Sequence, residues 1–167
     1  LAKVFPQARF VFLHRDVRET LASMIEAWKS GRFVTYRNLP GWTGELPWSL
    51  LLTPGWRDLN GMSLPEIVAR QWETATRILL DDLGAIAPDR IVIARYDALL
   101  ANPAAEIAHL CKALDFGWDR PLDKLPLSRY TVTPPDPNKW RRHEAEILGA
   151  LPGIHGTVER AQQFAAR

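Results

Sequence analysis

A short apolar run followed at once by a helix start constrains the fold of this chain most strongly. Residues 10–13, Phe-Val-Phe-Leu, have the length and continuous apolar character of a strand buried on both faces of a parallel sheet. Asp16 can cap the helix that follows, Glu19 stands where a capping box needs it, and Gly31 can end the helix. Arg15 is therefore expected where a strand's carboxyl end meets a helix N-terminus. Ligands bind at such crevices in open α/β sheets, and helix N–H groups there favour anions.

The residues around Arg15 resemble a motif of the sulfotransferase family, which uses the sulfate donor PAPS (3′-phosphoadenosine 5′-phosphosulfate). In that family a strand ends in Arg-Asp-Pro-Arg, with a Ser eight residues after the first Arg. Here residues 15–18 are Arg-Asp-Val-Arg, and Ser23 has the matching spacing. The resemblance implies that Arg15 and Ser23 hold the 3′-phosphate of the nucleotide. The alternative from the residues alone is a surface Arg beside a helix cap, with Ser23 on a solvated helix face.

A second strand and helix start lie in residues 90–103, where Asn102 can cap the helix and Pro103 takes its first position. The family has Arg-Tyr-Glu-Asp-Leu at this point, and the chain has Arg-Tyr-Asp-Ala-Leu at 95–99. The resemblance implies that Tyr96 lies beside the adenine. The alternative is a strand-end Tyr with a buried ring and a hydrated hydroxyl. The following helix is expected to bury the face made of Ile107, Leu110, Cys111 and Leu114.

The third similar segment, residues 128–142, has a Pro-rich loop that leads to Lys-Trp. We name it the closing segment, because it resembles the family's C-terminal segment that closes over the nucleotide. The resemblance implies that Lys139 reaches the 3′-phosphate, that Trp140 packs behind it, and that Ser128 is a further candidate for the same phosphate. The alternative is a basic helix start whose Lys139 is simply solvated.

The family's N-terminal loop, which grips the 5′-phosphosulfate, has no counterpart in this sequence. No Gly-x-x-x-x-Gly-Lys, no Ser-Gly-Thr and no Gly-rich turn before a helix is found. We therefore expect the chain to be the C-terminal portion of the domain, with the catalytic base before Leu1. We also expect residues 1–167 alone to show no sulfotransferase activity.

Together these segments predict an α/β fold. It would be a three-layer, P-loop-NTPase-like parallel sheet flanked by helices, in a single domain over residues 1–167 that is incomplete at the N-terminus. Two strands do not make an independently stable sheet. A missing N-terminal portion or a partner chain is expected to complete it. A long helix between the strands should start at the Ser63–Glu66 capping box and end at Gly84, with a buried face of Val68, Trp72, Ala75, Leu79 and Leu83.

Residues 32–61 form a long connection rich in Trp, Pro and Gly. Long connections without regular structure are usually functional or disordered, and the aromatic content argues against disorder. We predict a lid or acceptor-binding wall beside the nucleotide site. The alternative is a surface loop whose Trp rings fill a small core of their own.

Composition limits the partners and cofactors. The net charge of +2, with acids and bases interleaved, gives no support for nucleic-acid binding. A single cysteine, Cys111, and four scattered histidines give no metal-ligand spacing, so no metal is expected. His14 is expected to be a hydrogen-bonded core histidine. No segment is long enough to span a membrane, and a cytoplasmic location is expected.

The resemblance implies transfer of a sulfuryl group from PAPS, leaving PAP, to a hydroxyl or amine of a small-molecule, carbohydrate or peptide acceptor. One alternative is a P-loop nucleotide or nucleoside kinase, which shares the three-layered architecture. The other is a non-catalytic remnant of the fold that only binds a nucleotide or a partner.

Overall fold

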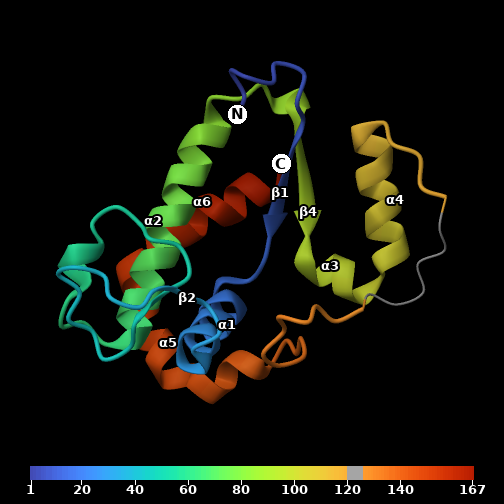
Figure 1. The fold of residues 1–167 in the computed structure, drawn as a ribbon. Helices are drawn as coiled ribbons and strands as arrows, with labels where there is room; N and C mark the ends of the chain where they lie inside the picture. The colour runs from blue at the N-terminus through green and yellow to red at the C-terminus, as the bar shows by residue number, and fades with distance from the viewer. Residues whose placement is uncertain (120–125) are drawn as a thin grey trace.

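A pair of parallel strands forms the centre of the molecule in the computed structural model, which describes residues 1–119 and 126–167 (Figure 1). Strand β1 (Phe10–His14) pairs with β4 (Ile91–Arg95), with Phe10 opposite Ile91 and His14 opposite Arg95. The mixed α/β class and the parallel pairing agree with the prediction. Within the described residues, however, the expected three-layer sheet consists of these two strands only.

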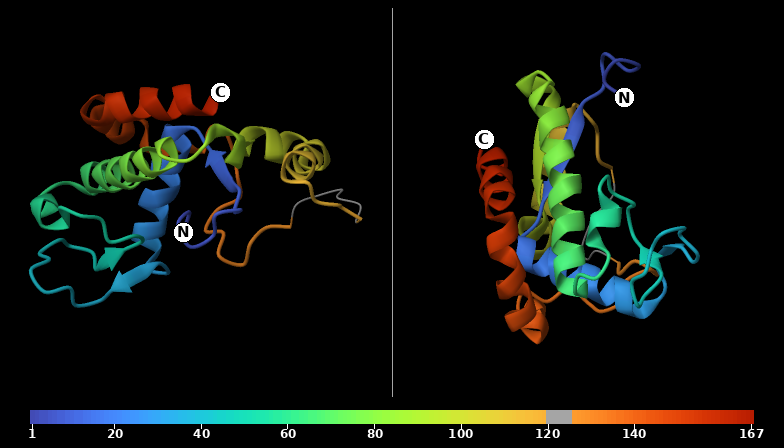
Figure 2. Two further views of the ribbon diagram at one scale, coloured as in Figure 1. Left: turned by 90° about the horizontal axis from the view of Figure 1, so that it is seen from above. Right: turned by 90° about the vertical axis from the view of Figure 1, so that its left-hand side faces the viewer.

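Helices lie on both sides of this strand pair (Figures 1 and 2). Helix α2 (Leu64–Gly84) and helix α6 (His155–Ala165) cover one face, where an apolar cluster unites Phe12, Leu80, Leu83, Ala161 and Phe164. The rings of Phe12 and Phe164 meet edge to face, with centroids 5.2 Å apart. On the other side, helix α4 (Pro103–Leu114) packs against β4.

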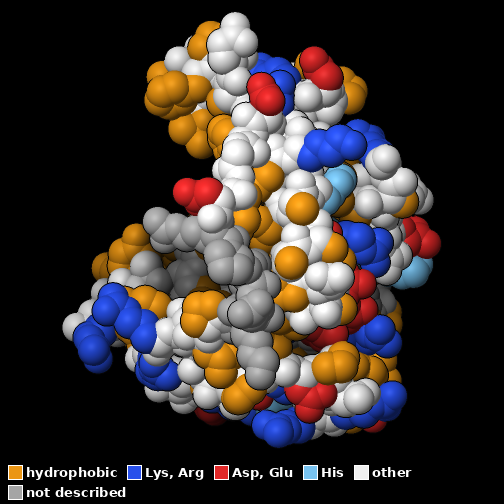
Figure 3. Space-filling view, turned by 90° about the vertical axis from the view of Figure 1, so that its right-hand side faces the viewer, with side chains coloured by type: hydrophobic (Ala, Val, Ile, Leu, Met, Phe, Trp, Pro, Cys, Tyr) orange, Lys and Arg blue, Asp and Glu red, His pale blue; other side chains and the backbone are white. Residues whose placement is uncertain are grey.

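The prediction that β1 is buried on both faces is wrong. Val11 is 46% exposed and Leu13 is 53% exposed, whereas Phe12 between them is buried. The reason is the position of α4, which packs beside β4 and leaves this face of β1 uncovered by the described residues. Figure 3 views the molecule from the α4 side and shows apolar side chains on this side of the surface. Phe116, Trp118 and Leu127 are further exposed apolar residues of the chain.

Helix α1 (Val17–Ser30) begins and ends where the sequence predicts. The Asp16 carboxylate accepts hydrogen bonds from two backbone N–H groups of the first turn, and Gly31 ends the helix with a φ of 65°. The Glu19 half of the predicted capping box does not form. The Glu19 carboxylate instead pairs with the Arg15 side chain, because the two lie one helical turn apart.

Helix α2 has the predicted capping box between Ser63 and Glu66 and ends at Gly84 as expected. Of its predicted buried face, Val68 and Leu83 are buried, whereas Trp72 and Ala75 are only half-buried. Leu79 is 44% exposed, and its neighbour Leu80 is buried instead. Leu80 contacts the sheet cluster, whereas Leu79 lines a cavity between α1, α2 and α6.

Residues 32–61 are more regular than expected. They contain an antiparallel pair, β2 (Val34–Tyr36) and β3 (Trp48–Ser49), and a 3₁₀ turn, η1 (Trp56–Leu59). Four indole rings pack together with centroids 4.9 to 6.4 Å apart, namely those of Trp28, Trp42, Trp48 and Trp56.

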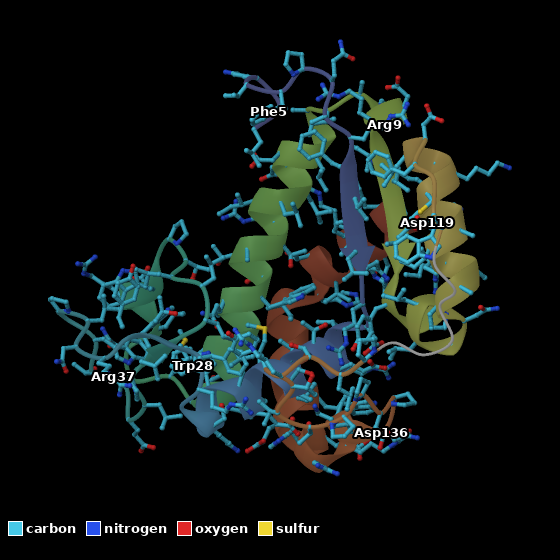
Figure 4. All side chains as sticks on the ribbon, turned by 45° about the vertical axis from the view of Figure 1, so that its right-hand side comes forward. Phe5, Arg9, Trp28, Arg37, Asp119 and Asp136 are labelled. Atoms are coloured by element: carbon cyan, nitrogen blue, oxygen red, sulfur yellow. The ribbon has the colours of Figure 1, made fainter. Side chains whose placement is uncertain are left out.

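This tryptophan cluster joins the loop to the helices. Trp28 lies where α1, α2 and this loop meet (Figure 4). Its indole N–H donates to the buried amide of Gln71, whose NH₂ group donates to the Ser49 carbonyl at 3.0 Å. The rings therefore belong to the main core and do not form a small core of their own, as the alternative interpretation of the sequence had it. A role for the segment in acceptor binding stays a prediction.

The remaining elements frame the carboxyl ends of the strands. A short turn, η2 (Pro88–Arg90), precedes β4, and α3 (Tyr96–Ala101) follows it. The closing segment ends in η3 (Lys139–His143), and α5 (Glu144–Ala150) and η4 (Leu151–Ile154) follow.

Helix α4 starts as predicted, with the Asn102 side chain accepting from the Ala105 N–H. Among the described elements, α4 packs mainly against β4 and α3. Its predicted inner face is only half-buried: Ile107, Leu110, Cys111 and Leu114. The predicted single domain includes residues 120–125, which lie outside the described ranges. In the part that the structure describes, no helix is long and apolar enough to cross a membrane.

Candidate functional site

The parallel strand pair brings Arg15 and Tyr96 together. His14 is opposite Arg95 in the strand register, so the next residue of each strand emerges at the same edge of the sheet. The guanidinium of Arg15 lies over the Tyr96 ring, with its central carbon 4.4 Å from the ring centroid. This distance is that of a cation–π contact. The Arg15 Nε also lies 3.3 Å from a carboxylate oxygen of Glu19 on α1.

A cavity of about 210 Å³ lies beside this stack, and we call it the small cavity. Its walls come from α1, from the start of α3, from Phe33 and from the closing segment. Four of the five residues selected from the sequence line it, namely Arg15, Ser23, Tyr96 and Lys139. The structure therefore brings together side chains from three separate segments of the chain.

Lys139 is not the solvated residue of the alternative interpretation. Its side chain is only 9% exposed, and its Nζ lies 2.7 Å from Oε2 of Glu26. The same oxygen accepts a hydrogen bond of 2.6 Å from the Thr133 hydroxyl. Both contacts tie the closing segment to α1.

Glu26 is charged at neutral pH in this setting. Burial alone would raise the pKa of its carboxyl group, but the hydrogen bonds from Lys139 and Thr133 act in the opposite direction. With the positive charges of Lys139 and Arg142, they lower the pKa of Glu26 below its usual range.

The two serines differ in their surroundings. The Ser23 hydroxyl lines the small cavity and has no hydrogen-bond partner among the described residues. Ser128 is exposed, lies outside the cavity lining, and accepts a hydrogen bond of 3.2 Å from the Tyr130 N–H. The structure thus groups Ser23, but not Ser128, with the other selected residues.

The model of a protein family described as "Sulfotransferase family" matches residues 1–120, more than two thirds of the chain. The chain belongs to the sulfotransferase family. The resemblance carried by the motifs at 15–23 and 95–99 is thereby confirmed, and the closing segment lies beyond the matched range. Comparisons with curated proteins and with solved structures gave no match.

A second cavity of this sulfotransferase-family chain, of about 610 Å³, shares Arg15 and Tyr96 with the small cavity. We call it the large cavity. It lies between the strand ends, α2, α6 and η3, and its apolar lining includes Trp72, Leu79 and Trp140. The two cavities together flank the Arg15–Tyr96 stack.

His14 lines the large cavity and is only half-buried. The expectation of a hydrogen-bonded core histidine is not met, because no described residue hydrogen-bonds to its ring. Burial lowers the pKa of His14, and the charge of Arg95 lowers it further, so the ring is neutral at pH 7.

Trp140 packs into the main core. The Arg18 guanidinium lies 4.9 Å from its ring centroid, and that of Arg141 lies 5.1 Å away. Asp16 in turn binds the Arg18 side chain at 2.9 Å. Trp140 therefore connects the closing segment to the N-terminus of α1.

Glu26 and Thr133 are cavity residues that the sequence analysis did not select. The available signal was the spacing on α1, since Glu19, Ser23 and Glu26 are separated by four and three residues and so share a helix face. No spacing within α1 reveals that this face meets Lys139. Across the ranges 1–119 and 126–167, no group of three or more His, Cys, Asp or Glu side chains could hold a metal ion.

Proposed function

We propose that this chain binds the nucleotide of PAPS within a domain that transfers the sulfuryl group to a hydroxyl or amine acceptor, and that residues 1–167 alone do not carry out the transfer. Arg15, Ser23, Tyr96 and Lys139 would hold the nucleotide. The observation that carries the proposal is the small cavity, which these four side chains line together. Membership of the sulfotransferase family supports sulfuryl transfer over the kinase alternative.

The donors of the small cavity suit a phosphate group. The Arg15 guanidinium offers a planar fork of N–H donors, the Ser23 hydroxyl is unpartnered among the described residues, and the Lys139 ammonium carries three donors. A volume of about 210 Å³ is below the range of about 300–1,000 Å³ typical of whole-ligand pockets. We therefore assign the small cavity to the 3′-phosphate and its ribose. The adenine would lie along Tyr96, which also borders the large cavity.

The chain's own residues would act on the nucleotide part of the donor. PAPS supplies the sulfuryl group, and negative charge grows on the departing nucleotide during transfer. Arg15 and Lys139, which we assign to the 3′-phosphate, would hold and orient that nucleotide. The charge itself grows on the 5′-phosphate, and the proposal assigns none of these four residues to that group. The proposal assigns no residue to the base that takes the acceptor's proton.

The acceptor would approach along the segment 32–61. Phe33 of this segment lines the small cavity, which supports a wall beside the donor site. The buried Trp48 and Trp56 anchor the segment, so we propose a fixed wall and not a moving lid. The acceptor is a small molecule, a carbohydrate or a peptide, and the location is proposed to be cytoplasmic.

We also propose that β1 and β4 belong to a larger P-loop-NTPase-like parallel sheet. The support is that β1 and β4 each pair along one edge only within the described residues, which leaves an edge where a further strand could add. The exposed apolar pair Val11 and Leu13 on the face of β1 would also need an element to cover it. A further part of the same domain or a partner chain would supply that element.

Calorimetric titration with PAP and with AMP tests the proposed donor. We expect PAP to bind more tightly, because AMP lacks the 3′-phosphate. Arg15→Ala should weaken PAP by about 2–3 kcal/mol, the scale of a lost charge-assisted contact, and leave AMP nearly unchanged. The control is Arg77→Ala, since Arg77 is an exposed arginine of α2 outside both cavities. Equal losses for both nucleotides, or no preference for PAP, would contradict the proposal.

A further inference from the structure

A carboxylate stands beside the cation that we assign to the 3′-phosphate. Glu26, Thr133 and Lys139 all line the small cavity. Glu26 Oε2 lies 2.7 Å from Lys139 Nζ and 2.6 Å from the Thr133 hydroxyl. The Glu26 side chain is 13% exposed, so water screens this ion pair poorly. A site for an anion thus contains a negative charge of the protein itself.

We propose that Glu26 is the resident counter-ion of Lys139 and competes with the 3′-phosphate for the Lys139 ammonium group. This inference rests on the proposed function. It makes Glu26 a residue that sets the affinity and the charge selectivity of the donor site.

The competition follows from the cost of burying charge. A buried ammonium group needs a counter-charge, and Glu26 supplies one negative charge to Lys139. A phosphate monoester carries close to two negative charges at neutral pH and three acceptor oxygens. It can therefore displace the Glu26 carboxylate from the ammonium group. A singly charged ligand group would bind the ammonium group little more strongly than this carboxylate does.

A second carboxylate of α1 pairs with the other cation of the small cavity. Glu19 pairs with Arg15 at 3.3 Å, just as Glu26 pairs with Lys139. Both cations that we assign to the phosphate thus have an acidic partner on α1. The Lys139 pair is the more buried and the shorter of the two, so it should control binding more strongly.

Glu26→Gln tests the competition, because glutamine keeps an acceptor oxygen for Thr133 and removes the charge. In calorimetry on residues 1–167, we expect PAP to bind about tenfold more tightly and AMP to change less than about twofold, as removal of one nearby charge implies. Without ligand, the variant should unfold at a lower urea concentration, since Lys139 loses its counter-charge. Circular dichroism checks that it folds.

Three further variants sharpen the test. Glu26→Asp keeps the negative charge but moves it away from Lys139, because the side chain is shorter. We expect the affinity for PAP to rise about threefold. The double variant Glu26→Gln, Lys139→Met should bind PAP less than about threefold more tightly than Lys139→Met alone. The reason is that the ammonium group for which Glu26 and the phosphate compete is absent from both proteins. Glu73→Gln removes the same charge from an ion pair with Arg70 on α2, outside both cavities, and should leave PAP binding unchanged.

The outcomes separate this inference from the proposed function. If the parent prefers PAP over AMP but Glu26→Gln binds PAP no better, the competition is refuted and the donor assignment stands. The competition is also refuted if Glu26→Gln raises the affinity for AMP as much as that for PAP. It is likewise refuted if Glu26→Gln raises PAP affinity about tenfold in the Lys139→Met background. If neither protein prefers PAP over AMP, the donor assignment and the competition fall together.

Discussion

The guanidinium of Arg15 lies over the ring of Tyr96, with its central carbon 4.4 Å from the ring centroid, although β1 and β4 are far apart in the sequence. The contact arises because the two strands are parallel and His14 is in register with Arg95. It separates the small cavity from the large one, since both cavities include these two residues in their walls.

Replacing Tyr96 tests the importance of this stack. Tyr96→Phe keeps an aromatic face for Arg15, so PAP affinity should change less than about twofold. Tyr96→Leu removes the face, and we expect a loss of about 1 kcal/mol in PAP binding, the scale of a partly exposed cation–π contact. Isothermal titration of both variants measures the difference. An equal loss in the two would assign the effect to the hydroxyl group instead.

Lys139 should control protection of the closing segment. We expect PAP to slow proteolysis within residues 131–142, because a bound phosphate would hold Lys139 and the start of η3. Lys139→Met should remove this protection while the fold survives by circular dichroism. Lys29→Met, at an exposed lysine of α1 outside the small cavity, serves as the control and should keep it. Protection that is the same in Lys139→Met and the parent would remove Lys139 from the site.

The two faces of β1 should differ sharply in their contribution to stability. Phe12→Ala removes a buried ring that packs on Phe164, and should lower the free energy of unfolding by about 3 kcal/mol. Val11→Thr changes an exposed side chain of the same shape and should cost less than about 0.5 kcal/mol. Urea unfolding gives both values. A large cost for Val11→Thr would mean that this face is covered in solution.

Asp16 should make stability depend on pH in the acid range. Burial tends to raise the pKa of its carboxyl group, but hydrogen bonds from Arg18 and from the Glu19 N–H lower it below the usual value. Unfolded chains then bind the proton more readily, so this contribution is present above the unfolded pKa and is lost as pH falls through the folded pKa.

Two substitutions separate the cap of α1 from the charge of Asp16. At pH 7, Asp16→Ala should cost about 1 kcal/mol as a lost helix cap, and Asp16→Asn should cost less because asparagine also caps. Both should flatten the loss of stability on acidification in urea titrations from neutral to acid pH. An unchanged acid slope in both variants would show that Asp16 is not the group that titrates.

Local signals in the sequence were enough to predict where several strands and helices of this protein begin and end. The strand that begins at Phe10, the cap at Asp16, the stop at Gly31 and the capping box of Ser63 and Glu66 were all predictable. Such signals work because caps and apolar periods depend on residues within one or two helical turns. The family motif also selected four residues that prove to line one cavity.

How these strands and helices pack against one another could be seen only in the folded structure. The exposure of Val11, the rotation of α2 that exposes Leu79, and the pairing of Glu26 with Lys139 depend on which element packs against which. Glu26 and Lys139 lie in segments that the chain brings together only on folding. An ion pair of this kind leaves no spacing in the sequence, because its energy depends on a distance in space and on burial by other elements.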